Sequence, residues 1–173
     1  MADNRIKLFS SPDKVIRKNI KAGDRIFIDM DDTILDRHMI KSRIQSGDAS
    51  AKDILELSVP YKGCVEVVEK LSKKYDLYIL TGGNFPKPGS TFNDMDWKYD
   101  WIRKYFGPDD KNIFYNKIIF CVHKELLLPS GSYLIDNLNY ERTGTDEWNK
   151  KEKLIHFGNS QFPDWEAIGK FLL

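Results

Sequence analysis

The sequence lacks several features that would assign the chain to a specialised class of protein. It has only two cysteines among 173 residues, Cys64 and Cys121, and no CxxC pair, which excludes a disulfide framework and the usual zinc spacings. No window approaches about 18 uninterrupted apolar residues, which argues against a membrane span. The stretch MADNRIKLFSSPDK (1–14) has no long apolar run, so we expect neither a signal peptide nor an anchor. A reducing cytosol, and hence a cytoplasmic protein, is the simplest expectation.

An excess of charge of either sign is also absent. Basic residues number 27 and acidic residues 26, so the formal net charge is +1. This balance gives no electrostatic reason to expect a long nucleic acid or an anionic membrane as a partner, whereas a small anionic ligand can be held by a few placed cations. Hydrophobic residues make up 41% of the chain, as in a folded protein, and the length fits one domain. Nothing in the sequence indicates an oligomeric state.

Short apolar runs alternate with helical patterns along most of the chain. Strands separated by helices predict an α/β fold of the Rossmann-like, three-layer α/β/α type, with a parallel central sheet. The expected strands are residues 25–30, 76–80, 117–122, 132–136 and 153–157. The expected helices are residues 48–58, 63–75, 97–107 and 164–173.

Three segments fall outside this alternation. Residues 1–24 are predicted as an N-terminal extension without assigned structure, and residues 25–173 as the core. The polar segment 37–59, which contains the expected helix DASAKDILELS and ends before Pro60, is predicted as a small helical cap inserted into that core. The segment NFPKPGSTFNDMD (84–96) is predicted as a long loop because of its prolines and glycine.

Polar residues stand where four of the expected strands end. The first strand runs into DMDDT (29–33), the second into TGG (81–83), the third into HK (123–124) and the fourth into DN (136–137). In parallel sheets, ligands bind beyond the carboxyl ends of the strands, where the winding order reverses. Each of these tips offers a group suited to a metal or a phosphate.

The first tip predicts phosphoryl chemistry. Asp29 and Asp31 stand two positions apart, so both carboxylates point to one side of an extended strand end. One carboxylate can accept a phosphoryl group while the other transfers protons, with magnesium and a lysine neutralising the phosphoryl oxygens. The residues predicted to assist are Asp136 for the metal, Lys124, the Thr81 hydroxyl and the backbone N–H groups of Gly82 and Gly83.

The same motifs resemble those of the haloacid-dehalogenase-like phosphatases. DMDDT (29–33) is similar to their first motif, DxDx[TV], the strand ending in Thr81 to the second, Lys124 to the third, and LIDN (134–137) to the acidic fourth. Within that superfamily the chain most resembles the 5′(3′)-deoxyribonucleotidases. That likeness lies in TFNDMDWKYDWIRKYFG (91–107) and the spacing through IIFCVHK to YLIDN.

This resemblance implies a role for each matching residue. Asp29 attacks phosphorus, forming an aspartyl-phosphate, and Asp31 protonates the leaving alcohol and then activates water. The implied ligands of Mg²⁺ are the Asp29 carboxylate, the Asp31 backbone carbonyl, Asp136 and, through a bound water, Asn137. The implied ligands of the substrate phosphate are Thr81, Gly82, Lys98 and Lys124.

The chain departs from the family pattern at three places. Asn137 stands where the family often has a second acid, which predicts weaker metal affinity. TGG replaces a threonine-serine pair, which moves one phosphate contact to the backbone. The expected cap contains no Phe, Tyr or Trp to sandwich a nucleobase. Stacking would then come from elsewhere, and the candidates are Tyr61, Phe85, Phe92 and Trp97.

The function predicted is that of a magnesium-dependent phosphomonoesterase acting on a small phosphorylated substrate, with a (deoxy)nucleoside monophosphate implied by resemblance. Two alternatives stay open: a phosphatase for another small phosphate ester or for a nucleic-acid end, and a non-catalytic metal- or nucleotide-binding protein. A calcium loop is excluded because Thr33 and Ile34 occupy positions that need an oxygen ligand and a glycine. For Lys98 a solvent-facing position on the helix is the alternative, and for Asp32 and Asp36 we expect surface or turn positions.

Overall fold

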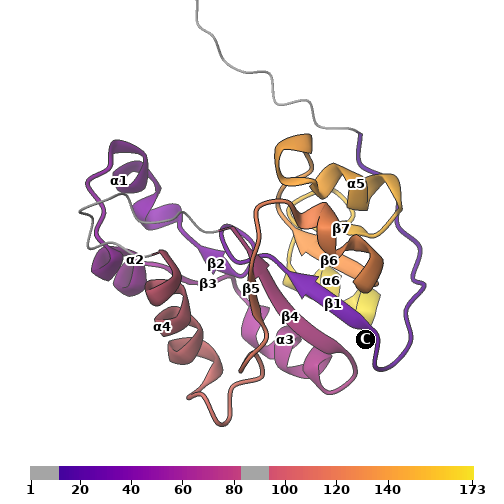
Figure 1. The fold of residues 1–173 in the computed structure, drawn as a ribbon, viewed down its shortest axis with the longest axis horizontal. Coiled ribbons are helices and arrows are strands. Elements are labelled where there is room, and N and C mark those ends of the chain that lie inside the picture. Colours follow the sequence, from indigo (N-terminus) through magenta and orange to yellow (C-terminus); the bar gives the residue numbers. More distant parts are fainter. Residues whose placement is uncertain (1–11, 83–93) are drawn as a thin grey trace, which may run out of the picture.

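A parallel sheet lies at the centre of the protein, with helices on both of its faces (Figure 1). The computed structural model describes residues 12–82 and 94–173. In these ranges the strands of the sheet follow the order β5-β4-β1-β6-β7, and every neighbouring pair is parallel. Their bounds are β1 Arg25–Ile28, β4 Asp76–Thr81, β5 Ile118–Phe120, β6 Tyr133–Asp136 and β7 Leu154–His156. The predicted α/β fold with a parallel sheet is confirmed.

Alternation along the strands divides the interior into two cores. Ile26 and Ile28 of β1 face a large core under α3, α4 and α6, whereas Phe27 faces a smaller one with Trp148 of α5. The second core also receives side chains of a 3₁₀ helix, η2. The bounds of these elements are α3 Cys64–Ser72, α4 Asp94–Phe106, η2 Lys124–Ser130, η3 Glu141–Thr143, α5 Thr145–Lys150 and α6 Trp165–Leu172.

The segment predicted as a cap leaves the sheet after β1 and returns before α3 (Figure 1). It contains η1 His38–Ile40, α1 Lys41–Ser46 and α2 Ala51–Leu57, and it is flanked by β2 Leu35–Asp36 and β3 Val59–Pro60. The short strands β2 and β3 pair antiparallel and form its neck. The cap contacts α4 in two ways: α2 packs on that helix, and the Trp101 indole N–H donates to the Ser58 carbonyl at 3.1 Å.

The N-terminal segment, which the sequence left unassigned, packs along the core from residue 12 onward. Ile16 is buried, and its backbone N–H and carbonyl both bond the Gln161 side chain, at 3.1 and 3.0 Å. Asn19 donates its backbone N–H to the Tyr133 hydroxyl at 2.8 Å. Residues 1–11 lie outside the described residues. The loop predicted over 84–96 also lies largely outside them, and its residues 94–96 form the start of α4.

None of the helices in the two described ranges combines the length and the apolar character that a membrane crossing needs.

Candidate active site

The loop after β1 carries the acidic motif and is held from several sides. The backbone N–H of Asp29 donates to Ile135 of β6 at 2.8 Å, and the N–H groups of Ile34 and Leu35 return to the Met30 carbonyl at 3.2 and 3.0 Å. From the core side, the Trp165 indole donates to the Thr33 carbonyl at 2.9 Å. The carboxylates that follow the strand are therefore placed on a fixed turn.

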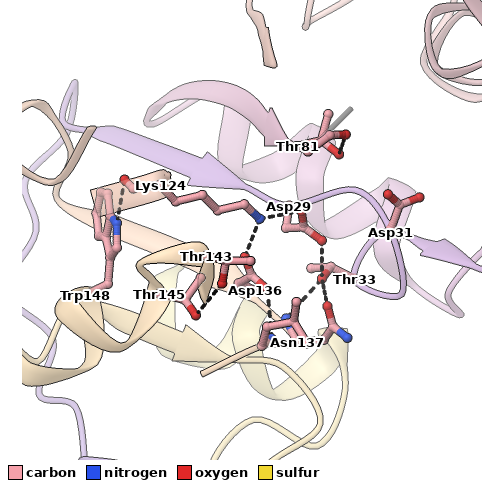
Figure 2. A network of polar contacts seen from close by, with 12 residues as sticks. Asp29, Asp31, Thr33, Thr81, Lys124, Asp136, Asn137, Thr143, Thr145 and Trp148 are labelled. Atoms are coloured by element: carbon pink, nitrogen blue, oxygen red, sulfur yellow. Dashed lines mark hydrogen bonds and ion pairs between the residues drawn. The ribbon is translucent and has the colours of Figure 1, made fainter. Parts of the chain in front are cut away.

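Two of the predicted carboxylates converge on one lysine (Figure 2). The Lys124 ammonium bonds Asp29 Oδ1 at 2.6 Å and Asp136 Oδ2 at 2.5 Å, and all three side chains are buried. Burial raises the pKa of Asp29 to about 7, with Lys124 opposing this effect and the nearby Asp136 and Asp31 adding to it. Burial alone would lower the pKa of Lys124, but Asp136 and Asp29 outweigh it and hold the pKa above its ordinary value.

The remaining oxygens of this group are bonded by the loops beside them. Asp136 Oδ1 accepts the Leu138 backbone N–H at 2.8 Å, and Asp29 Oδ2 lies 3.1 Å from the Thr33 hydroxyl. The same hydroxyl lies 3.2 Å from Asn137 Oδ1 and accepts the Asn137 backbone N–H at 3.1 Å. Since a hydroxyl has one proton, Thr33 can donate to only one of its two acceptors at a time.

Lys98 of α4 holds the second catalytic candidate. Its ammonium bonds Asp31 Oδ2, Thr81 Oγ1 and the Gly82 carbonyl, each at 2.7 Å, so its three N–H donors all have protein acceptors. The side chain is 2% exposed, and the alternative of a solvent-facing lysine is wrong. Helix α4 thereby joins the acidic loop to the tip of β4.

A cleft of about 230 Å³ opens at these strand tips. Its lining residues are Asp29, Asp31, Asp32, Arg37, Gly82, Val122, Lys124, Asn137, Leu138 and Thr143. Three of the predicted site residues, Thr81, Lys98 and Asp136, are buried behind this wall and do not line it. The site is thus layered, with one set of groups facing the cleft and a second set holding them from behind.

Sequence reasoning missed three contributors to this site. Arg37 forms a two-pronged bond with Asp32, at 3.1 and 2.7 Å, at the edge of the cleft. Asp32 lies in a turn, as expected, but its side chain is paired and lines the cleft. Trp148 and Trp165 donate their indole N–H groups to the carbonyls of Lys124 and Thr33, at 3.0 and 2.9 Å. No local sequence pattern identifies these tryptophans as site residues, because the carbonyl groups that accept their N–H bonds are far away in the chain.

The aromatic residues considered for base stacking do not line the cleft where the structure describes them. Tyr61 packs edge-on against Phe157 in a separate, more open crevice, and Trp97 is buried in the core. Phe85 and Phe92 lie outside the described residues.

The donors at the strand tips suit a magnesium ion. The carboxylates of Asp29 and Asp136 already converge on one positive charge, that of Lys124, and the Asn137 amide oxygen stands beside them. No group of three or more acidic, His or Cys side chains with metal-site geometry occurs in residues 12–82 and 94–173. Magnesium typically uses one or two carboxylates and keeps several waters, so a site of two carboxylates with a backbone carbonyl and an amide fits its chemistry.

The chain is similar to known proteins both in sequence and in structure. No protein-family model matches the chain. The chain is 30% identical over 155 residues to a protein of Vibrio phage KVP40 that carries the provisional name 5′(3′)-deoxyribonucleotidase, and the match covers 85% of this chain and 83% of the phage protein. Among solved structures, a class C acid phosphatase from Bacillus anthracis with tungstate bound matches with a TM-score of 0.47 and 17% identity, over 86% of this chain and 71% of that one.

Proposed function

The chain belongs to the family of the 5′(3′)-deoxyribonucleotidases, and we propose that it is a magnesium-dependent phosphomonoesterase that releases phosphate from (deoxy)nucleoside monophosphates through an aspartyl-phosphate. The observation that carries this proposal is the pairing of two carboxylates with two buried lysines at one cleft. Asp29 is held by Lys124 and Asp31 by Lys98, at 2.6 and 2.7 Å. Buried ion pairs are costly, and a reaction gives a reason to keep them.

The reaction proceeds in two steps. A carboxylate oxygen of Asp29 bonds to phosphorus as the bond from phosphorus to the ester oxygen breaks, and that oxygen takes the proton of the Asp31 carboxyl. An alcohol leaves, and Asp29 carries the phosphoryl group. The ionised Asp31 then accepts a proton from a water whose oxygen bonds to phosphorus, and the bond between Asp29 and phosphorus breaks. Inorganic phosphate is released and both carboxyl groups return to their first state.

Basic residues at the cleft hold the carboxyl groups of Asp29 and Asp31 in fixed positions. Lys124 holds Asp29 against Asp136 and presents a positive charge beside the attacking oxygen. Lys98 fixes one oxygen of Asp31 and ties it to Thr81. Gly82, which lines the cleft, is the candidate for a backbone contact to a phosphoryl oxygen.

The balance of charge favours a divalent cation. The cleft and its back wall hold four carboxyl groups and three cations, namely Asp29, Asp31, Asp32 and Asp136 with Arg37, Lys98 and Lys124. A phosphate ester adds about two further negative charges. Magnesium bound by Asp29, the Asp31 carbonyl, Asp136 and, through water, Asn137 would neutralise part of this charge on the transferring group.

A second substrate class is favoured by one observation. The cleft lining includes no aromatic side chain among the described residues, so a ring sandwich for a nucleobase is missing from that part of the chain. A small phosphate ester without a base, such as a sugar phosphate, would also suit a cleft of about 230 Å³.

The test is phosphate release from a panel of 5′- and 3′-(deoxy)nucleoside monophosphates and sugar phosphates, with magnesium or with a chelator, for the wild type and Asp29→Asn. We expect turnover with magnesium only, and a loss of at least ~10³-fold in the variant. Turnover of sugar phosphates alone would support the proposed reaction but contradict the assignment of nucleotides as substrates. Turnover that survives in Asp29→Asn would contradict a mechanism through an aspartyl-phosphate on Asp29.

Thermal unfolding shows whether the Asp29→Asn variant is folded. Because burial raises the Asp29 pKa from 3.8 to about 7, ionising this carboxyl group costs folding free energy. That cost is absent below pH ~3.8 and is fully present above pH ~7. The neutral Asn variant should therefore be at least as stable as the wild type above pH ~7 in chelator.

A further inference from the structure

Given the function proposed above, we propose that Arg37 is a positioning residue for Asp31, the acid–base carboxyl group, and that Asp32 holds Arg37 in place for this role. Arg37 follows β2 directly and is the first residue of the segment predicted as a cap. It therefore connects the cap to the catalytic loop.

The guanidinium of Arg37 uses one edge for Asp32 and turns another nitrogen toward Asp31. Its Nε and Nη2 donate to Asp32 Oδ1 and Oδ2 at 3.1 and 2.7 Å. Its Nη1 lies 3.4 Å from Asp31 Oδ1, an ion-pair distance. A planar guanidinium held at two points cannot rotate freely, so the third nitrogen keeps its place beside Asp31.

The backbone of Asp32 makes this arrangement possible. Asp32 has φ of 56°, in the left-handed region that few residues other than glycine adopt, although Asp and Asn tolerate it best. Its backbone N–H closes the loop by donating to the Leu35 carbonyl at 2.9 Å. A glycine would fit this conformation more easily, yet the position carries a carboxylate whose two oxygens both engage Arg37.

The two oxygens of Asp31 have different surroundings. Oδ2 accepts from Lys98 at 2.7 Å, whereas Oδ1 is buried without a hydrogen bond and has only the Arg37 ion pair. Oδ1 is therefore the oxygen of Asp31 that no hydrogen bond occupies, and Asp31 itself lines the cleft. Lys98 holds one oxygen of Asp31 and Arg37 lies beside the other, so the two cations together restrict rotation of the carboxyl group.

The cap supplies a matched pair for comparison. Arg43 also donates two hydrogen bonds to one carboxylate, from Nη1 and Nη2 to Asp53 at 3.2 and 2.9 Å, but neither residue lines the cleft. The Arg43 side chain is 45% exposed, against 25% for Arg37. A change at Arg43 thus reproduces the loss of an Arg–Asp pair without touching Asp31.

The experiment compares esters that differ in their need for an acid. Arg37→Lys, Asp32→Asn, the double variant and Arg43→Lys are assayed on p-nitrophenyl phosphate, whose leaving group departs without a proton, and on the best alkyl ester of the panel above. For Arg37→Lys we expect kcat/KM, which reports the steps up to departure of the leaving group, to fall ~10- to 100-fold on the alkyl ester and less than ~3-fold on p-nitrophenyl phosphate. Hydrolysis of the aspartyl-phosphate also uses Asp31, so kcat can fall on both esters. The double variant should lose no more than Arg37→Lys, since the two residues act as one unit. Arg43→Lys should match the wild type.

Equal losses of kcat/KM on both esters, or no loss on either, would overturn the assignment of Arg37 while leaving the phosphatase function in place. A wild-type protein that hydrolyses no ester would overturn the proposed function, and the role of Arg37 with it.

Discussion

The carboxyl edge of the sheet and the cap both pair aspartates with basic side chains, but they do so in opposite surroundings. At the sheet edge, Lys124 lies between Asp29 and Asp136, and none of the three is more than 7% exposed at its side chain. In the cap, Arg43 and Asp53 form a pair of similar length with side chains 45% and 29% exposed. The residue types are alike, and burial is what differs.

This difference separates the proposed active site from a surface contact. Removing charges from water costs several kcal/mol for each ion, which pairing offsets only in part, while an exposed pair contributes about 0–1 kcal/mol. The buried network of Lys124, Asp29 and Asp136 therefore makes the protein less stable than apolar side chains of the same volume would. We interpret the four acids and three cations at the cleft as retained for chemistry, and the cap pair as local support for α2.

The largest effect should follow from removing the central cation. In Lys124→Met, Asp29 and Asp136 stay buried and lose the cation between them, so we expect a loss of about 3–5 kcal/mol in the free energy of unfolding in chelator. Magnesium should restore more of this loss than it adds to the wild type, because the vacated position lies between two carboxylates. Denaturant unfolding with and without magnesium measures both effects.

Lys150→Met is the control for this variant, since Lys150 also bonds two acids, the buried Asp146 and the partly exposed Glu147, both at 2.7 Å, while its own side chain is 48% exposed. Its stability should fall by less than that of Lys124→Met, because only one of the two acids is buried. If Lys124→Met proves as stable as Lys150→Met, burial does not separate the two kinds of network.

A smaller effect is expected at the tryptophan that holds the backbone of Lys124. Trp148→Phe removes the 3.0 Å bond to the Lys124 carbonyl and some core volume, which should cost about 1–3 kcal/mol and lower kcat ~3- to 10-fold. Trp101→Phe removes a matching 3.1 Å bond to Ser58 in the cap and should cost similar stability. Equal loss of kcat in both variants would show that Trp148 supports the fold in general and not Lys124 in particular.

The smallest effect is expected in the cap pair. Hydrogen bonds from Ser50 and Arg43 hold the pKa of Asp53 at about 2, so the pair keeps its charge down to acidic pH. Its contribution is present above pH ~3.8 and is lost as the pH falls through ~2. Arg43→Ala should lower Tm by less than ~2 °C at neutral pH, and by less still at high salt. A larger drop measured by thermal unfolding would contradict the view that this exposed pair is local.

Lys98 shows where prediction from sequence ends. The motif order and the resemblance assigned it to the phosphate site, but its helix pattern alone indicated a solvent-facing lysine equally well. Only the packing of α4 against the tip of β4 brings its ammonium to Asp31 and Thr81. Arg37 was not identified at all, because Asp32 can pair with it only in the left-handed backbone conformation that the folded loop adopts.

Local chain geometry is enough to set the spacing of Asp29 and Asp31, the apolar runs that became strands, and the polar groups at their ends. A residue's position along a strand determines the side to which it points, and the carboxyl ends of parallel strands meet at one edge. The strand order, the cation between Asp29 and Asp136, and the indole bonds to Lys124 and Thr33 were decided by tertiary structure alone. These contacts join residues 12 to 132 positions apart, and such pairings depend on the packing of whole layers and leave no periodic signal in the sequence.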